Sequence, residues 1–187
     1  MLSLVASHRF FIFVYAFATR SSRTIFTAVC HDWLSLLQSD EAKKIILDAL
    51  KFRTDKEQVK VCAYVIMPNH IHIIWRIAAD IVPADFQRDF LKFTAKSLLH
   101  YYKDCPILNR LKVDKKDRKY QVWKRDSMSI DLYSPQFFRQ KLEYIHANPC
   151  QPKWMLVDNP SDYRYSSSSF YEEGKDEFNI LTHYNVI

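Results

Sequence analysis

The stretch that decides the fold of this 187-residue chain is Met67-Pro68-Asn69-His70-Ile71-His72-Ile73-Ile74-Trp75. Apolar residues alternate over 59–66, Met67-Pro68-Asn69 forms a turn, and an apolar run follows over 70–77, which together predict a tight hairpin of two antiparallel strands. Alternate side chains of a strand point to one face, so His70 and His72 project together, about 6–7 Å apart at the Cα level. The opposite face, which can anchor the strand in a core, carries Ile71, Ile73, Trp75 and Ile77.

The spacing of the two histidines suits two imidazoles that converge on one divalent metal ion. The pair alone is weak evidence, because a lone histidine pair on a strand is more often structural than metal-binding. The interpretation therefore needs a second element that completes the chemistry.

That second element is a helix predicted over residues 134–148. Ser134 can cap its start, and Pro135 fits its first position. Pro149 disfavours helical geometry at the residue before it, so the helix ends near Asn148. The buried stripe of this helix is predicted to be Phe138, Leu142 and Ile145.

An adjacent polar stripe on the same helix consists of Gln140, Tyr144 and Asn148. A tyrosine and an amide one turn apart can then face the histidine pair. His146 points about 200° away from Tyr144 around the helix, so it is a poor candidate for the same site.

In their order along the chain, three motifs resemble those of a known family. The histidine stretch is followed by Tyr144-Ile145-His146-Ala147-Asn148-Pro149 and then by Asp162-Tyr163-Arg164-Tyr165-Ser166-Ser167. The set resembles the REP-associated tyrosine transposases, which belong to the HUH superfamily of single-strand DNA nucleases and are related to the single-tyrosine transposases of small insertion sequences. The resemblance covers about residues 23–172.

The resemblance implies a metal-dependent single-stranded DNA endonuclease and strand transferase. His70 and His72 match the pair that holds a divalent metal, Mg²⁺ or Mn²⁺. Asn148 stands where relatives carry an amide third ligand, and Tyr144 matches the nucleophile. Tyr144 would form a 5′-phosphotyrosine intermediate and release a 3′-hydroxyl, which can later reverse the step and join strands without ATP.

The resemblance also implies a partner, single-stranded DNA near a hairpin or inverted repeat, and no membrane. Monomers and dimers both occur among related transposases, so a monomer and a homodimer stay open. The chain departs from many relatives at residues 150–154, where it has Cys-Gln-Pro-Lys-Trp and they have a small or branched residue and then Arg-Ala-Gly. This departure weakens any expectation that the same DNA hairpin is read.

The pattern of apolar residues predicts strands over 24–29, 59–66, 70–77 and 120–125, with helices over 40–52, 83–102 and 134–148. The first six elements describe an α+β fold, a ferredoxin-like antiparallel sheet with helices on one face, to which the C-terminal tyrosine-bearing helix is added. We expect a lead-in over 1–22, a catalytic domain over 23–172 and a tail over 173–187. Residues 150–187 are predicted to be loosely organised, with 166–169 as a loop.

The apolar run over 10–18 is short for a membrane span. We interpret it as an irregular lead-in or as an extension from an upstream start. A DNA-processing enzyme has no reason for export, so we expect the cytoplasm.

The composition agrees with a nucleic-acid partner. The net charge of +6 favours a polyanion, and 15% aromatic residues suit base stacking as well as a core. Gly174 is the only glycine, which argues against nucleotide triphosphatases and dinucleotide enzymes because both need glycine-rich phosphate loops. The four cysteines form no Cys-x-x-Cys pair, so free thiols in a reducing cytoplasm are expected.

Basic residues gather in three places that can guide DNA. They recur at helical spacing over 83–102, they crowd a predicted long loop over 110–119, and they follow Trp123 at the end of the last predicted strand. The DNA-binding candidates are Arg88, Lys92, Lys96, Arg110, Lys112, Lys115, Lys116, Arg118, Lys119, Lys124 and Arg125.

Two other functions compete with the transposase-like one. The first is a catalytically inactive nucleic-acid-binding module of the same fold, although it does not explain the ordered tyrosine–amide turn. The second is a structural zinc site or a hydrolytic metalloenzyme built on His70 and His72, which lacks a third strong ligand in the sequence.

Overall fold

A computed structural model describes residues 22–186 of the chain. Four strands form one sheet: β1 (Thr24–Val29), β2 (Val59–Met67), β3 (His70–Ile77) and β6 (Met128–Asp131). Their order is β2-β3-β1-β6, and each neighbouring pair is antiparallel. This is the strand order of a ferredoxin-like α+β sandwich, so the predicted fold class is confirmed.

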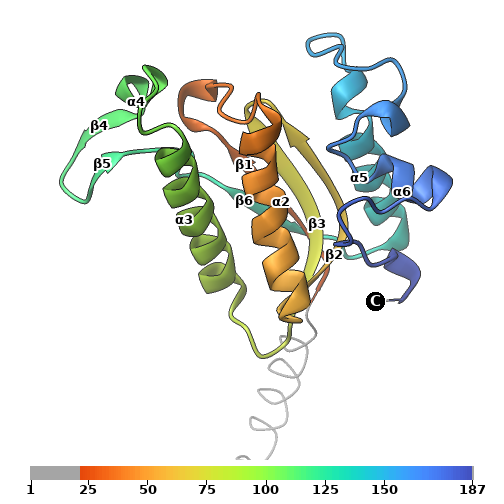
Figure 1. Ribbon diagram of the computed structural model, residues 1–187. Helices are drawn as coiled ribbons and strands as arrows, with labels where there is room; N and C mark the ends of the chain where they lie inside the picture. The colour runs from red at the N-terminus through yellow and green to blue at the C-terminus, as the bar shows by residue number, and fades with distance from the viewer. Residues whose placement is uncertain (1–21, 187) are drawn as a thin grey trace, which may run out of the picture.

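Two helices, α2 (Asp40–Asp55) and α3 (Pro83–Tyr101), cover one face of the sheet (Figure 1). The apolar face of β3 meets them, as its alternation predicts. Trp75 stacks on Phe26 of β1 at 4.9 Å between ring centroids, and Phe86 and Phe90 of α3 pack edge-on against the same indole. This side of the sheet is therefore the main core.

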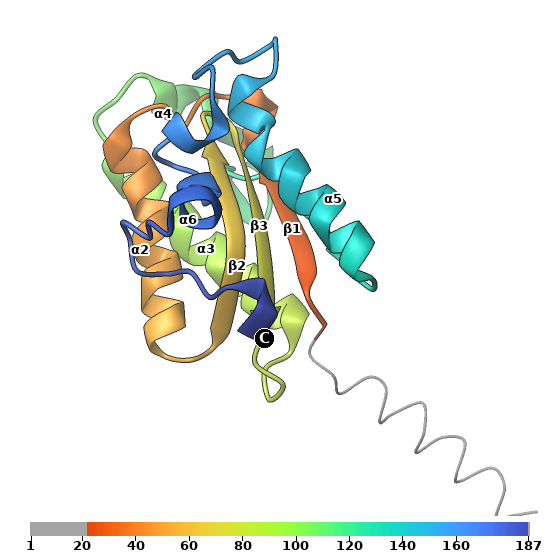
Figure 2. The same cartoon turned by 90° about the vertical axis from the view of Figure 1, so that its right-hand side faces the viewer.

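The helix α5 (Pro135–His146) lies on the opposite face (Figures 1 and 2). Ser134 caps it, because its Oγ accepts a hydrogen bond from the Phe137 backbone N–H at 3.1 Å. Phe138 and Ile145 are buried against apolar side chains of β1, β2 and β3. The side chains of β3 that point to this face, including His70 and His72, are thereby brought under α5.

The last strand of the sheet is not the one that the sequence predicted. Tyr120 ends the separate strand β5 (Arg118–Tyr120), residues 121–125 make only an isolated bridge between Trp123 and Cys30, and the fourth strand of the main sheet is β6. The Trp123 indole turns inward, donating a hydrogen bond to Thr94 Oγ1 of α3 at 3.1 Å. β6 is exposed along its whole length, so its sequence lacks the alternation of a half-buried strand.

The predicted loop over 110–119 is a hairpin. After the short helix α4 (Ile107–Arg110), β4 (Lys112–Lys115) pairs with β5 (Arg118–Tyr120) in a separate two-stranded sheet. It extends from the end of α3, away from the main sheet (Figure 1).

The C-terminal region is ordered, contrary to the loose organisation that we expected. β2 is an edge strand, and an uncovered edge exposes backbone groups that seek partners. The Ile66 N–H donates to the Tyr165 carbonyl, and the Ser167 N–H donates to the Tyr64 carbonyl, each at 2.9 Å. The third family-like motif therefore covers this edge.

A helix also replaces the loop predicted at 166–169. Ser166 and Ser167 are buried against β2, and α6 (Ser168–Glu173) starts directly after them. Gly174 ends α6 in a left-handed conformation, with φ of 73°. Short 3₁₀ turns complete the description, at His31–Trp33, Asn148–Cys150, Pro160–Asp162 and Tyr184–Val186.

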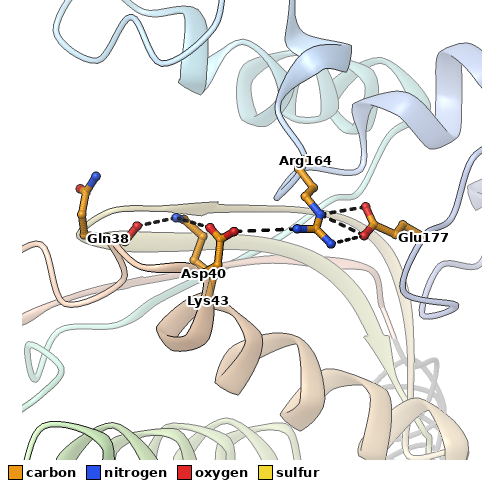
Figure 3. Close-up of polar contacts among 5 residues, drawn as sticks. All are labelled: Gln38, Asp40, Lys43, Arg164 and Glu177. Atoms are coloured by element: carbon orange, nitrogen blue, oxygen red, sulfur yellow. Dashed lines mark hydrogen bonds and ion pairs between the residues drawn. The ribbon is translucent and has the colours of Figure 1, made fainter.

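Charged groups tie the C-terminal region to the start of α2 (Figure 3). The Arg164 guanidinium donates to Glu177 at 2.9 Å and lies 3.8 Å from Asp40. Lys43, which is buried, donates to the Gln38 carbonyl at 2.8 Å. The contacts of Arg164 hold residues 163–167, the strap beside β2, in place at the edge of the sheet.

The expected lead-in falls almost wholly on residues 1–21, which lie outside the described residues. Within residues 22–186, no helix is both long and apolar enough to cross a membrane.

Candidate active site

His70 and His72 lie side by side on β3, under α5. Their ring centroids are 4.9 Å apart and their planes are nearly perpendicular, at 78°. Both residues are buried, with exposed fractions of 5% and 6%. The strand geometry predicted from the sequence is therefore present, and the two imidazoles converge.

The Nδ1 atom of each imidazole already has a hydrogen-bond partner. His70 Nδ1 lies 2.7 Å from Asn69 Oδ1, and the orientation of this amide is fixed because Asn69 Nδ2 donates to the Trp33 carbonyl at 3.2 Å. His70 Nδ1 is therefore the protonated nitrogen. His72 Nδ1 lies 2.7 Å from the hydroxyl of Thr27 on β1. Each imidazole thus has a partner on Nδ1, and a partner on one ring nitrogen is typical of histidines that bind a metal ion through the other.

Burial keeps both imidazoles neutral at physiological pH. Loss of hydration lowers the pKa of His70 to about 4, although a hydrogen bond with the Asn148 side chain opposes the shift. The pKa of His72 falls to about 3, because of burial first and then the charges of His70 and Lys153. A neutral imidazole has a free lone pair, which is the form that binds metal ions.

Tyr144 projects from α5 beside this pair. Its ring centroid lies 5.4 Å from that of His72, and the side chain is 48% exposed. The Lys141 ammonium, one turn earlier, lies 5.7 Å from the centre of the Tyr144 ring. A phenol that solvent can reach, next to a buried imidazole pair and a cation, is well placed to meet a phosphate group.

Asn148 completes the group. It lies one turn after Tyr144, in the 3₁₀ turn that Pro149 imposes, and it is buried. Its Nδ2 donates to the Tyr144 carbonyl at 2.9 Å, so the side-chain hydrogen bond between Asn148 and His70 uses its Oδ1. The four candidate catalytic and metal-binding residues, from β3 and from the end of α5, thus meet in one place.

His146 lies elsewhere, as its position on the helix predicts. Its Nε2 is 2.8 Å from the Ser167 hydroxyl, which in turn accepts a hydrogen bond from the Tyr64 backbone N–H at 3.0 Å. This chain of contacts links α5 to the covered edge of β2.

Three residues next to the site carried no functional prediction. Thr27 and Asn69 contact the two Nδ1 atoms, and the Trp154 ring lies 5.7 Å from that of His70. Asn69 adjoins His70 in the sequence and could have been found there. Thr27 could not, because only strand pairing brings it opposite His72.

Five of the DNA-binding candidates line one groove of about 490 Å³ between α3 and residues 118–127. They come from two distant segments and are Arg88, Lys92, Arg118, Lys124 and Arg125. The remaining six are exposed at other positions, namely Lys96, Arg110, Lys112, Lys115, Lys116 and Lys119. Tyr120 and the buried Trp123 also line the groove.

Some of these cations are already paired with carboxylates. Arg88 contacts Asp85 and Asp89, and Asp117 contacts both Arg118 and Arg125. Across residues 22–186, Lys92 and Lys124 form no ion pair. These two lysines are therefore the groove cations most available to a phosphate.

No family model and no curated protein matches this sequence. Solved structures do. A REP-associated tyrosine transposase, solved bound to a REP hairpin, is 17% identical, with 87% of this chain and 86% of that chain covered and a TM-score of 0.58. The chain has the fold of this transposase. A putative transposase from Deinococcus radiodurans R1 is 16% identical over 65% of this chain and 87% of that chain, with a TM-score of 0.44. The resemblance that the motifs indicated is thus confirmed at the level of the fold.

Proposed function

We propose that this protein is a metal-dependent single-stranded DNA endonuclease and strand transferase of the transposase type, with Tyr144 as its nucleophile. One observation carries the proposal: an accessible phenol lies beside two buried, neutral imidazoles that converge and each have a partner on Nδ1. The fold of a REP-associated tyrosine transposase supports it.

The proposed reaction transfers a phosphodiester to the tyrosine. Tyr144 Oη gives up its proton and forms a bond to the scissile phosphorus, the bond from phosphorus to the 3′ oxygen breaks, and that oxygen takes up a proton. The products are a 5′-phosphotyrosine and a free 3′-hydroxyl. Because the adduct keeps a phosphodiester, a second 3′-hydroxyl can attack it and release Tyr144, which joins two strands without ATP.

His70, His72 and Asn148 are the residues that would hold a divalent metal, Mg²⁺ or Mn²⁺. Their donor atoms fit such an ion, because two imidazole nitrogens and an amide oxygen meet next to Tyr144. Nitrogen-rich sets of this kind suit Mn²⁺ better than Mg²⁺, and the cellular supply of each ion also matters. When bound, the ion would stabilise negative charge on the scissile phosphate.

A single strand next to a DNA hairpin is the substrate class that we propose. The groove between α3 and residues 118–127 offers cations for the backbone, and the solved transposase with this fold binds a REP hairpin. Trp154, which contacts His70, belongs to the segment that departs from many relatives, so we expect a different hairpin sequence to be read. The protein would cleave and join this DNA in the cytoplasm, as a monomer or as a homodimer.

The alternative is a binding module of the same fold without catalysis. It has no need for an exposed tyrosine beside paired imidazoles. A zinc site built on the two histidines alone is less favoured, because within residues 22–186 no three His, Cys, Asp or Glu side chains cluster as metal ligands would.

The test is capture of a covalent intermediate. Single-stranded oligonucleotides with Mg²⁺ or Mn²⁺ should give a protein–DNA adduct that survives denaturant and electrophoresis. Tyr144→Phe should abolish the adduct and leave DNA binding intact. The matched control is Tyr133→Phe, which removes the hydroxyl of an 84% exposed tyrosine just before α5 and should leave the adduct unchanged.

Two results would count against the proposal. Binding with no adduct under any metal condition favours the non-catalytic module. An adduct that persists in Tyr144→Phe and vanishes in Tyr133→Phe assigns the reaction to another tyrosine.

A further inference from the structure

Trp33 is the most exposed tryptophan in the molecule. Its side chain is 56% exposed, whereas Trp75 and Trp123 are buried at 0% and 6%. An indole this open to solvent offers a large aromatic face that a ligand can reach.

The backbone around Trp33 is strained in a way that presents this ring. Asp32 and Trp33 have φ of 49° and 56°. This is a left-handed backbone conformation that residues other than glycine rarely adopt. Hydrogen bonds hold the turn in place, from the His31 N–H to the Val122 carbonyl at 2.7 Å and from the Trp33 N–H to the Cys30 carbonyl at 3.1 Å. Strain of this kind gathers at binding and catalytic sites.

The same turn is connected to the candidate active site. The Trp33 carbonyl accepts the hydrogen bond from Asn69, whose other amide atom contacts His70 Nδ1. Trp33 therefore lies one side chain away from the imidazole pair, at the end of β1 that pairs with the start of β3.

Lys124 accompanies the indole. Its ammonium lies 4.6 Å from the Trp33 ring centre, and its backbone N–H donates to the Val29 carbonyl at 2.8 Å. Lys124 also lines the basic groove. The pair thus connects the groove, which Lys124 lines, to His70, which the Trp33 carbonyl reaches through Asn69. It combines an aromatic face with a flexible cation, and these are the two groups that bind an unpaired nucleotide.

We propose that Trp33 and Lys124 form a stacking site for one unpaired nucleobase of the DNA strand that runs from the groove between α3 and residues 118–127 to Tyr144. The base stacks on the indole, and the Lys124 ammonium moves from the ring to the adjacent phosphate. This inference rests on the proposed function for its ligand class, single-stranded DNA, and it adds a residue pair that positions the strand.

The test measures the affinity for oligonucleotides under conditions that prevent cleavage, with the Tyr144→Phe variant and EDTA. Two short probes are compared, an oligothymidylate and an abasic oligomer with the same sugar–phosphate backbone. Trp33→Ala should weaken oligothymidylate binding about tenfold and leave abasic binding unchanged, because only the stacking contact is lost. Trp33→Phe should restore most of the affinity, and Lys124→Gln should weaken both probes.

The matched control is Phe52→Ala. Phe52 is also 56% exposed, but it lies near the end of α2, close to the start of β2 and away from His70. This variant should bind both probes as the parent does. Intrinsic fluorescence gives a second measurement: bound oligothymidylate should quench Trp33, and this part of the quenching should disappear in Trp33→Phe while any contribution of the half-buried Trp154 stays.

Equal weakening of both probes by Trp33→Ala, or the same loss in Phe52→Ala, would overturn the stacking site. Unchanged binding in a folded Trp33→Ala protein, checked by circular dichroism, would overturn it too and would leave the ring as a contact for another protein. The adduct assay and the binding assay can fail separately. If the adduct forms but Trp33→Ala has no base-dependent effect, the proposed function stands and the stacking site falls. If Trp33→Ala weakens base-dependent binding but no adduct forms, the stacking site stands and the proposed function falls.

Discussion

The rings of His72 and Tyr144 meet at 71° with their centroids 5.4 Å apart, although one residue belongs to β3 and the other to α5. The contact depends on α5 packing through Phe138 and Ile145 on the face of the sheet that carries the histidines. The proposed nucleophile and the proposed metal-binding pair therefore occupy one site only because two separately predicted elements pack together.

His70→Ala and His72→Ala should each lower metal-dependent cleavage more than about a hundredfold, because each removes one of the two imidazole donors. DNA binding should change little, since neither histidine lines the basic groove. Adduct formation and filter binding on the same oligonucleotide separate the two effects. Full metal-dependent cleavage in both variants would remove the histidines from the metal site.

Thr27→Val should weaken Mn²⁺ affinity about tenfold to a hundredfold, because the hydroxyl that orients His72 through Nδ1 is lost. Titration calorimetry of the protein without DNA measures this directly. The matched control is Thr24→Val on the same strand, whose buried hydroxyl has no hydrogen-bond partner in the described part of the chain. Equal losses in both variants would show that the effect is not specific to His72.

Neutralising Lys92 should lower the salt dependence of DNA binding. In Lys92→Gln the slope of log affinity against log salt should become less negative by about 0.7–0.9, which is the loss of one phosphate contact. Arg88→Gln should have a smaller effect, because Asp85 and Asp89 already share that charge. Lys60→Gln, an exposed position on β2, is the control. A slope that Lys92→Gln leaves unchanged would place the DNA outside this groove.

The free energy of unfolding should fall as the pH drops from about 6.5 towards 4. Burial lowers the pKa of His70 and of His146 to about 4 and that of His72 to about 3, whereas the unfolded chain takes up these protons near 6.5. The unfolded state then binds more protons than the native state in this window, so acid favours unfolding.

Urea unfolding at a series of pH values measures this effect. His146→Gln should flatten the slope by up to about 1.4 kcal/mol per pH unit. His100→Gln, at an exposed position of α3, should leave it unchanged. An equally steep slope in His146→Gln would mean that His146 takes up its proton in the native state as readily as in the unfolded chain.

Local sequence predicted most of the elements that build the site. β1 and β3 have the predicted bounds, and α5 starts where the Ser134 cap and Pro135 indicate. The elements that the sequence did not predict lack a hydrophobic pattern of their own. β6 is exposed and short. The strap over 163–167 is ordered by hydrogen bonds to the backbone of β2.

Alternation along a strand and 3.6-residue periodicity along a helix are properties of a single segment, and for this reason the sequence by itself determined that His70 and His72 share a face and that Tyr144 and Asn148 share a stripe. Which face of the sheet α5 covers, which hydroxyl meets His72, and where Trp33 lies relative to His70 are decided by pairing and packing between distant segments. Only the tertiary structure holds that information, because hydrogen bonds and buried contacts between β1, β3 and residues 122–124 fix those positions together.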